Sequence, residues 1–160
     1  MPSFDIASKT EMQEIDNAVN SSIREVANRY DFKGCGSKFE FDKEEIIILA
    51  NSDYKLKSMQ EILKVHATRR KIDIKAFEFK DPEKASGNML RQTVSIKQGI
   101  DSDNARKIIK LIKDEKFKVT SSNRGDKIRV EGKKIDDLRE VMSFLREQEL
   151  DIPLVFENFL

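Results

Sequence analysis

Glu45-Ile46-Ile47-Ile48-Leu49-Ala50 is a run of six residues in which only the first is polar. A short, almost wholly apolar run of this kind is typical of a strand at the centre of a sheet. The run has a counterpart in the second half of the chain, because Ile46 and Ile48 align with Ile128 and Val130 at one constant offset. This alignment predicts an internal duplication.

The elements that flank the two runs follow the same order in both halves. Strands are predicted over 3–7, 38–41, 45–50 and within 72–80 in the first half, and over 93–97, 117–122, 127–131 and 153–158 in the second. Helices are predicted to begin near residues 10 and 53, and to span 101–115 and 135–147. Each half therefore reads β-α-β-β-α-β, the split unit of ferredoxin-like folds. The predicted fold class is α+β, with two antiparallel sheets that are each covered on one face by two helices.

A polar segment containing both proline and glycine, Asp81 to Gly87, is the candidate linker between the two halves. It predicts a first ferredoxin-like unit over residues 1–84 and a second over residues 85–160.

Composition excludes several classes of function. The 160 residues carry a formal net charge of +1, so a general electrostatic attraction to nucleic acid is not expected and any such contact must be local. The single cysteine, Cys35, and the single histidine, His66, exclude an internal disulfide and a Cys/His metal cluster. The longest aliphatic run is too short for a membrane span, and the polar N-terminus lacks a signal region. We therefore expect a cytoplasmic protein that is not bound to a membrane.

The stretch Arg29-Tyr30-Asp31-Phe32-Lys33-Gly34 combines two aromatic rings and two cations with a carboxylate and a glycine. Rings stack on bases and cations bind phosphates, so this composition suits a nucleotide. A structural interpretation competes with it, because Tyr30 continues the apolar stripe of the first helix and Phe32 is placed to close the core. We expect Tyr30 to be buried and Phe32 to be at least half buried.

Signatures of catalysis are weak. Gly34-Cys35-Gly36-Ser37-Lys38 resembles a phosphate-binding turn, but it follows a helix and precedes a strand, the reverse of a dinucleotide or P-loop site. His66 lies on the apolar stripe of its helix and is predicted to be a core residue. The basic cluster Arg69-Arg70-Lys71 at the end of that helix is explained by the helix dipole. The sequence therefore predicts no catalytic residues, no metal site, no cofactor and no enzyme activity.

The predicted open faces of the sheets give a further, weaker indication. The second copy presents hydroxyl and cationic side chains there: Thr93, Ser95, Lys97, Lys118, Thr120, Lys127 and Arg129. This set suits phosphate but lacks the stacking rings of RNA-recognition modules, and an ordinary solvated face explains it as well. On the first copy, Ile47 and Leu49 point away from the helices, which indicates cover from the other copy or from another chain.

Several stretches together resemble the YajQ family of small bacterial nucleotide-binding proteins. They are Met1 to Ile6, Asp16 to Asn20, Arg29 to Gly34, Leu90 to Asp101 and Leu154 to Phe159, and their order and spacing cover nearly the whole chain. The resemblance implies the duplicated fold and admits an exchange of first strands between the two units, since both strands fit either sheet. It also implies non-enzymatic binding of purine nucleotides (GTP or ATP) or RNA. For some members it implies binding of cyclic di-GMP and action as a regulatory adaptor with a transcription-factor partner.

The residues expected to bind a nucleotide follow from motif chemistry at the matching positions. They are Arg29, Tyr30, Asp31, Phe32 and Lys33, with Arg91, Lys97 and Gln98 as phosphate or base contacts. Cys35 departs from the small polar residue more usual at its position, which puts a role for that side chain in doubt. Two alternatives stay open. One is a protein-interaction adaptor or transcription co-regulator without its own nucleotide, which uses Ile47 and Leu49 or Phe156 and Phe159, and the other is an enzyme that uses Cys35.

Overall fold

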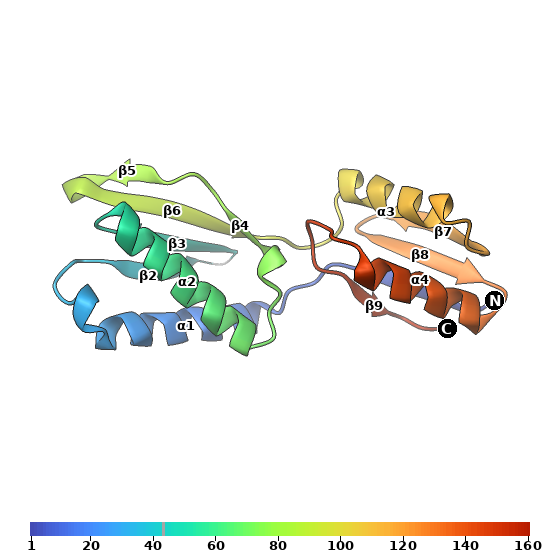
Figure 1. The fold of residues 1–160 in the computed structure, drawn as a ribbon, viewed down its shortest axis with the longest axis horizontal. Helices are drawn as coiled ribbons and strands as arrows, with labels where there is room; N and C mark the ends of the chain where they lie inside the picture. The colour runs from blue at the N-terminus through green and yellow to red at the C-terminus, as the bar shows by residue number, and fades with distance from the viewer. Residues whose placement is uncertain (43) are drawn as a thin grey trace. The chain divides into compact units, whose positions relative to one another are not determined.

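The computed structural model describes residues 1–42 and 44–160. In chain order the elements are β1 (Ser3–Ala7), α1 (Met12–Asn28), η1 (Tyr30–Phe32), β2 (Lys38–Asp42), β3 (Glu45–Ala50), α2 (Asp53–Arg69), η2 (Ile74–Ala76), β4 (Phe77–Phe79), β5 (Glu83–Ala85), η3 (Ser86–Asn88), β6 (Met89–Ile96), α3 (Ser102–Asp114), β7 (Val119–Arg124), β8 (Lys127–Gly132), α4 (Ile135–Glu147) and β9 (Val155–Glu157) (Figure 1). The three η elements are short 3₁₀ helices.

The chain forms two compact units, which are described separately. We call Thr10–Lys97 the inserted unit, and Met1–Lys9 together with Gln98–Leu160 the terminal unit. The inserted unit lies within the sequence of the terminal unit, so the chain passes between the units at residues 9–10 and again at residues 97–98.

The inserted unit has an antiparallel sheet with strand order β2-β3-β6-β4, and β5 pairs with the first half of β6. Helices α1 and α2 lie on one face of this sheet (Figure 1). The apolar stripe of α1, with Ile15 and Val19, packs there on Ile46 and Ile48 of β3, and all four side chains are buried. Burial of the stripe stabilises α1, because few isolated helices of this length are stable in water.

The terminal unit repeats the arrangement with strand order β7-β8-β1-β9 and helices α3 and α4. Its core contains Phe4 and Ile6 of β1, Ile128 and Val130 of β8, and Leu145 of α4. Ile48 and Val130 lie on equivalent strands, since β3 is flanked by β2 and β6 just as β8 is flanked by β7 and β1. The predicted duplicated α+β fold is confirmed.

The first strands are exchanged between the units. Strand β1 pairs with β8 and β9, with Phe4 opposite Val130 and Ile6 opposite Phe156. Strand β6, the first strand of the second repeat, pairs instead with β3 and β4 of the first repeat, with Val94 opposite Ile46.

The boundary between the units consequently differs from the predicted one at residues 84 and 85. These two residues lie within β5, and the segment interpreted as a linker forms the connection from β4 to β6 inside the inserted unit. Its glycine, Gly87, has a φ of 71° in the turn that joins β5 to β6. Proline and glycine mark a turn here rather than a domain boundary, since turns and linkers favour the same residues.

Candidate functional site

The stretch Arg29 to Lys33 follows the end of α1 and includes η1. Arg29 donates two hydrogen bonds to Asp31, from Nε to Oδ1 at 3.0 Å and from Nη2 to Oδ2 at 2.8 Å. This bidentate contact with the Arg29 guanidinium holds the pKa of the Asp31 carboxyl below its ordinary value. Arg29 also contacts Glu25, one helical turn earlier, at 3.4 Å. The two carboxylates hold the guanidinium in place at the surface.

The two aromatic rings of this stretch have opposite environments. Phe32 is 5% exposed and belongs to the core, as predicted, with the cations of Arg29 and Lys55 5.3 and 4.6 Å from the ring centroid. Tyr30 is 87% exposed, so the prediction that it is buried is wrong. The reason is local: α1 ends at Asn28 and Arg29 is extended, which turns the chain away from the helical stripe. Tyr30 is therefore the ring that is free to stack on a ligand.

The structure does not bring the other predicted site residues to this stretch. Arg91 lies opposite Leu49 on the face of the sheet away from the helices. Lys97 follows the far end of β6, about 20 Å along the strand from Arg91, and its backbone N–H donates to Ala76. Gln98 belongs to the terminal unit. The predicted set is thus one cluster, the single position Arg91, and the adjacent pair Lys97 and Gln98.

The expected cationic open face is also divided by the strand exchange. Thr93 and Ser95 lie on the inserted sheet, whereas Lys127 and Arg129 lie on the terminal sheet. There, the exchanged strand places Asp5 next to Arg129, at 3.1 Å. Glu157 of β9 contacts Lys127 at 3.0 Å and Lys9 at 2.8 Å. These carboxylates neutralise the face, which agrees with an ordinary solvated surface.

Ile47 and Leu49, which were expected to be covered by the other copy or by another chain, do not form a large exposed apolar patch. Ile47 is 7% exposed and lies between Glu40 and Thr93 on the neighbouring strands. Leu49 lies between Lys38 and Arg91 and is partly buried. Long side chains beside an apolar residue cover it with their aliphatic stems, so cover from another chain is not required.

A groove between α1 and α2 collects functional side chains that the sequence alone did not connect. The helices run antiparallel, since Glu14 near the start of α1 contacts Arg70 at the end of α2. Two neighbouring pockets lie in the groove, and Arg69 lines both of them. We call them the Tyr54 pocket and the His66 pocket.

The Tyr54 pocket has a volume of about 550 Å³. It combines an aromatic ring and aliphatic walls with charged side chains: Tyr54, Ile62, Val65, Arg29, Lys57 and Arg69, with Glu25 and Glu61. Tyr54 is 73% exposed in the first turn of α2. A pocket with an exposed ring, apolar walls and three cations suits a flat, anionic ligand.

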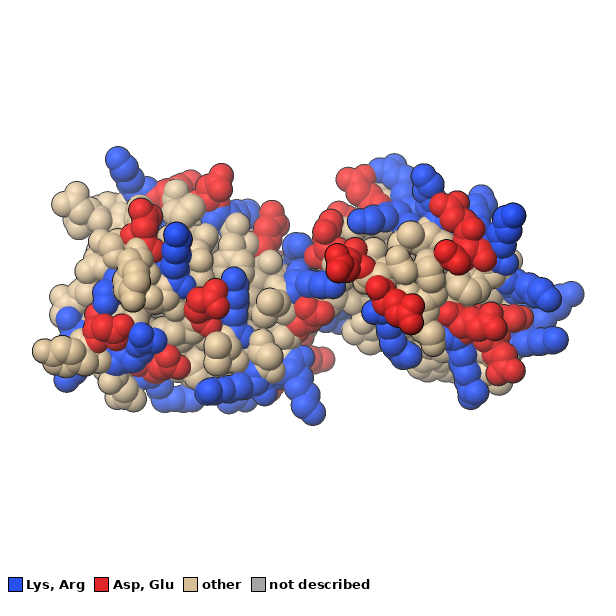
Figure 2. Space-filling model, viewed as in Figure 1, with Lys and Arg blue, Asp and Glu red and all other residues tan. Residues whose placement is uncertain are grey.

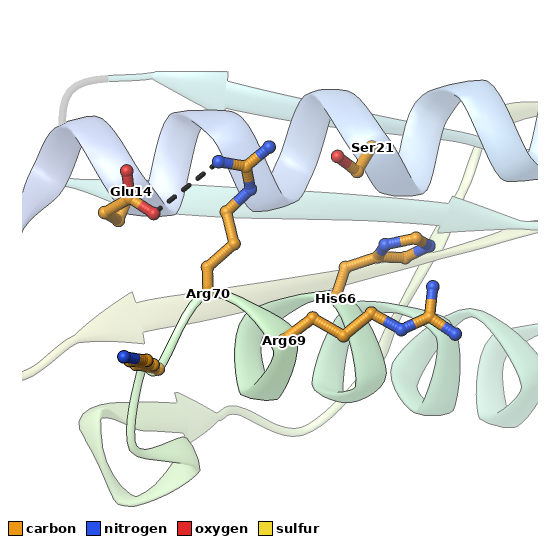
Figure 3. Close-up of a pocket in the computed structure, with 6 residues that line it drawn as sticks. Glu14, Ser21, His66, Arg69 and Arg70 are labelled. Atoms are coloured by element: carbon orange, nitrogen blue, oxygen red, sulfur yellow. Dashed lines mark ion pairs between the residues drawn. The ribbon is translucent and has the colours of Figure 1, made fainter.

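The His66 pocket has a volume of about 510 Å³ and is lined by Glu14, Ser21, His66, Arg69, Arg70 and Lys71. Figure 3 shows Arg70 reaching from the end of α2 towards Glu14 on α1. His66 was predicted to be a core residue, and its side chain is only 13% exposed. Its Nε2 lies 2.8 Å from Glu25 on α1, so it also joins the two helices. The cations here outnumber the carboxylates by three to one, which suits an anion.

The basic cluster Arg69-Arg70-Lys71 could be recognised in the sequence, but the residues that lie beside it in the fold could not. From the sequence alone, a favourable interaction with the helix dipole was enough to explain why three cations follow one another at the end of this helix. Their pocket is completed by Glu14 and Ser21, which the fold brings from α1. A cationic cluster at the end of one predicted helix becomes a site only when the second helix is placed beside it.

Charge is not concentrated elsewhere on the face of the molecule shown in Figure 2, where acidic and basic side chains are interspersed. In the part of the chain that the structure describes, no group of three or more His, Cys, Asp and Glu side chains can hold a metal. None of the described helices has the length and apolar character needed to cross a membrane. Cys35 and His66 have different partners, because Cys35 Sγ lies 3.0 Å from the Phe32 carbonyl oxygen while His66 contacts Glu25.

Comparison with known proteins shows one family over the length of the chain. A family model described as "Nucleotide-binding protein YajQ-like" matches residues 2–160. A nucleotide-binding protein of Paramagnetospirillum magneticum is 50% identical over 159 residues, which is 99% of both chains. Nucleotide-binding proteins of Magnetococcus marinus and Bdellovibrio bacteriovorus are 48% and 49% identical over 159 and 158 residues, with 99% of this chain covered and 99% and 98% of theirs.

Proposed function

The chain belongs to the family of YajQ-like nucleotide-binding proteins, and we propose that it binds a nucleotide in the groove between α1 and α2. The observation that supports this site is the Tyr54 pocket, whose lining combines an exposed ring with the cations of Arg29, Lys57 and Arg69. Rings bind the flat face of a base, and cations bind phosphate, so the pocket offers both kinds of contact that a nucleotide needs.

In this proposal the base stacks on Tyr54, and the aliphatic wall of Ile62 and Val65, further along α2, packs against the sugar. Glu61 accepts a hydrogen bond from the exocyclic amino group of a purine, while Glu25 stays paired with His66 and Arg29. The phosphates extend along the groove towards Arg69, where the surplus of positive charge is larger.

The stretch Arg29 to Lys33, at the end of α1, contributes to one side of the pocket. Arg29 lines it directly, and Asp31 fixes the orientation of the guanidinium. Tyr30 and Lys33 are exposed nearby in sequence and supply a second ring and another cation. Phe32 contributes through the core rather than by contact with the ligand.

The other predicted residues support a longer ligand. Arg91 and Lys97 are outside the lining of the groove and lie about 20 Å apart along β6, so one mononucleotide does not reach both of them from Arg29. RNA is the ligand class that can contact both places, whereas GTP, ATP and cyclic di-GMP are small enough for the groove alone. We propose binding without catalysis, in the cytoplasm, with the protein acting as a regulatory adaptor.

The test is a thermal-shift series with GTP, ATP, cyclic di-GMP and a single-stranded oligoribonucleotide. A ligand present at 100 times its dissociation constant adds roughly 2.7 kcal/mol to the stability, which is readily measured. Tyr54→Ala should abolish most of the shift, while Ile135→Ala, at an exposed position in the first turn of α4, should preserve it. Equal shifts for both variants would place the ligand outside the groove.

The dependence of binding affinity on salt concentration distinguishes RNA from small nucleotides. Binding of single-stranded RNA through Z phosphate contacts gives a log–log salt slope of about −0.7Z. A small nucleotide held by two or three cations has a correspondingly shallow slope. A steep slope that Arg91→Ala reduces would favour RNA.

A second candidate function, a protein-interaction adaptor without a nucleotide, is favoured by the exposed C-terminal side chains of the terminal unit. Phe159 is 60% exposed although it stacks on the buried Phe4, and Leu160 is also exposed. The aromatic contact of Phe156 with Phe4 instead ties that side chain to the core. This candidate predicts that none of the nucleotides gives a thermal shift and that Phe159→Ser removes binding of a transcription-factor partner.

A further inference from the structure

The His66 pocket differs chemically from the Tyr54 pocket beside it. Its lining has three cations and one carboxylate, whereas the Tyr54 pocket has three cations and two carboxylates. It also lacks the exposed ring and the aliphatic wall. A base therefore has little to contact in the His66 pocket, while a phosphate group has several donors.

Two of the three cations are uncommitted. Within the described residues, Arg69 and Lys71 form no ion pair. Ser21 adds a donor from the opposite helix, because its Oγ accepts a hydrogen bond from Arg24 at 3.1 Å and keeps its own proton for a ligand. Donors thus approach the pocket from both sides of the groove (Figure 3).

The cap at the end of α2 fixes the position of Lys71 in the pocket lining. Lys71, which follows the C-cap residue Arg70 of α2, has a φ of 61°, and the bonds from Lys71 N to Thr68 O and from Ile72 N to Ala67 O form a Schellman cap. Glycine is favoured at this position because a side chain strains the left-handed conformation. The cap places a cation in the pocket at a position where glycine would be more stable. Lys116 has the same conformation after α3, so the conformation fixes where the Lys71 side chain begins, and the pocket lining is what assigns it to the site.

The third cation, Arg70, is held by Glu14. Its Nη1 lies 3.6 Å from Glu14 Oε2, and both side chains are more than one-third exposed. The contact is long for an ion pair and accessible to water, so it contributes little to stability. The Glu14 carboxylate therefore occupies the place where a phosphate oxygen would accept a hydrogen bond from Arg70.

We infer that the His66 pocket is a phosphate subsite of the groove and that Glu14 is an internal competitor for it. This rests on the proposed function for the identity of the whole ligand, a nucleotide with at least two linked phosphates, but not for the chemistry of the subsite. Phosphate displaces Glu14 from Arg70, and Arg69 bridges the two pockets along the ligand. Glu14 thereby lowers the affinity of the subsite for phosphate groups.

The test uses the full chain and inorganic pyrophosphate, which has the phosphates without a base. Titration calorimetry of Glu14→Gln should show pyrophosphate binding tighter by roughly two- to fivefold than in the parent, the range that loss of one exposed ion pair allows. Arg70→Ala should weaken it by at least as much. Glu11→Gln, just before α1 and outside the pocket lining, is the matched control and should bind as the parent does.

The outcomes separate the subsite from the proposed function. If Glu14→Gln binds pyrophosphate no better than the parent, or if the parent binds none at millimolar concentration, the inference is overturned even when nucleotides bind. If pyrophosphate behaves as expected but nucleoside di- and triphosphates gain nothing from Tyr54, the subsite stands and the nucleotide site fails. A nucleoside without phosphate should be insensitive to Glu14→Gln.

Discussion

Tyr30 and Phe32 are separated by one residue, yet Tyr30 is 87% exposed and Phe32 is 5% exposed. The end of α1 and the 3₁₀ turn that follows direct one ring to solvent and the other into the core. The two rings therefore serve different purposes, and substitutions of each should have different effects.

Phe32→Ala should lower the free energy of unfolding by roughly 3–5 kcal/mol, because it removes a buried ring from the core. Tyr30→Ala should change it by less than about 0.5 kcal/mol, as is usual for an exposed position, and should weaken nucleotide binding by roughly 1–3 kcal/mol if the ring stacks on a base. Denaturant unfolding and ligand titration measure the two quantities. Comparable losses of stability in both variants would contradict this division of roles.

Arg29→Ala combined with Lys33→Ala should weaken nucleotide or RNA binding while the melting transition is nearly preserved. Both side chains are at least partly exposed, and exposed ion pairs contribute only about 0–1 kcal/mol. Lys107→Ala with Lys110→Ala removes the same charge from exposed positions on α3 and is the matched control. If the two double variants bind every tested ligand equally well, the stretch is architectural.

Lys71→Gly should both raise the free energy of unfolding and lower the affinity for pyrophosphate and nucleotides. Relief of the left-handed conformation should stabilise the protein by roughly 1 kcal/mol, and loss of the cation should weaken pyrophosphate and nucleotide binding. Lys116 provides the control, since it caps α3 with a φ of 56° and its N–H donates to Lys113. Lys116→Gly should be stabilising to a similar extent with unchanged affinity. Equal affinity in both variants would remove Lys71 from the site.

The terminal unit should show a pH dependence that comes from Asp5. Burial raises the pKa of this carboxyl, but hydrogen bonds from Asn158 and Arg129 outweigh burial and hold the pKa below its ordinary value. Because the folded-state pKa is the lower one, Asp5 stabilises the fold above the unfolded pKa of about 3.9, and this contribution is lost as the pH falls through the folded value.

The measurement is the free energy of unfolding of the parent and Asp5→Asn between pH 7 and pH 2.5. The parent should be the more stable at neutral pH, and the difference should shrink as the pH falls below about 4. Asp103→Asn, which removes an exposed carboxylate paired with Arg106, should give a difference near zero throughout. A difference between parent and Asp5→Asn that is independent of pH would show that packing, not charge, is the contribution of Asp5.

Local patterns in the sequence determined the elements and their duplication. The apolar run Glu45 to Ala50, its counterpart at Ile128 and Val130, and the helical stripes fix which side chains must be buried, because burial of apolar surface dominates folding. They also placed Phe32 correctly, since a large ring beside a helix stripe has most to gain from the core. Tyr30 was misplaced because the helix ends two residues earlier, and helix ends are only weakly encoded by periodicity.

Only the tertiary structure decided which sheet each first strand joins and where the groove lies. Phe4 and Ile6 match Val94 and Ile96 in pattern, and pairing between strands distant in sequence selects between two arrangements that local preference does not distinguish. For the same reason, Arg70 could be recognised in the sequence as a cation at a helix end, but not as the partner of Glu14. That contact joins residues on two helices, and their meeting is set by the packing of both on one sheet.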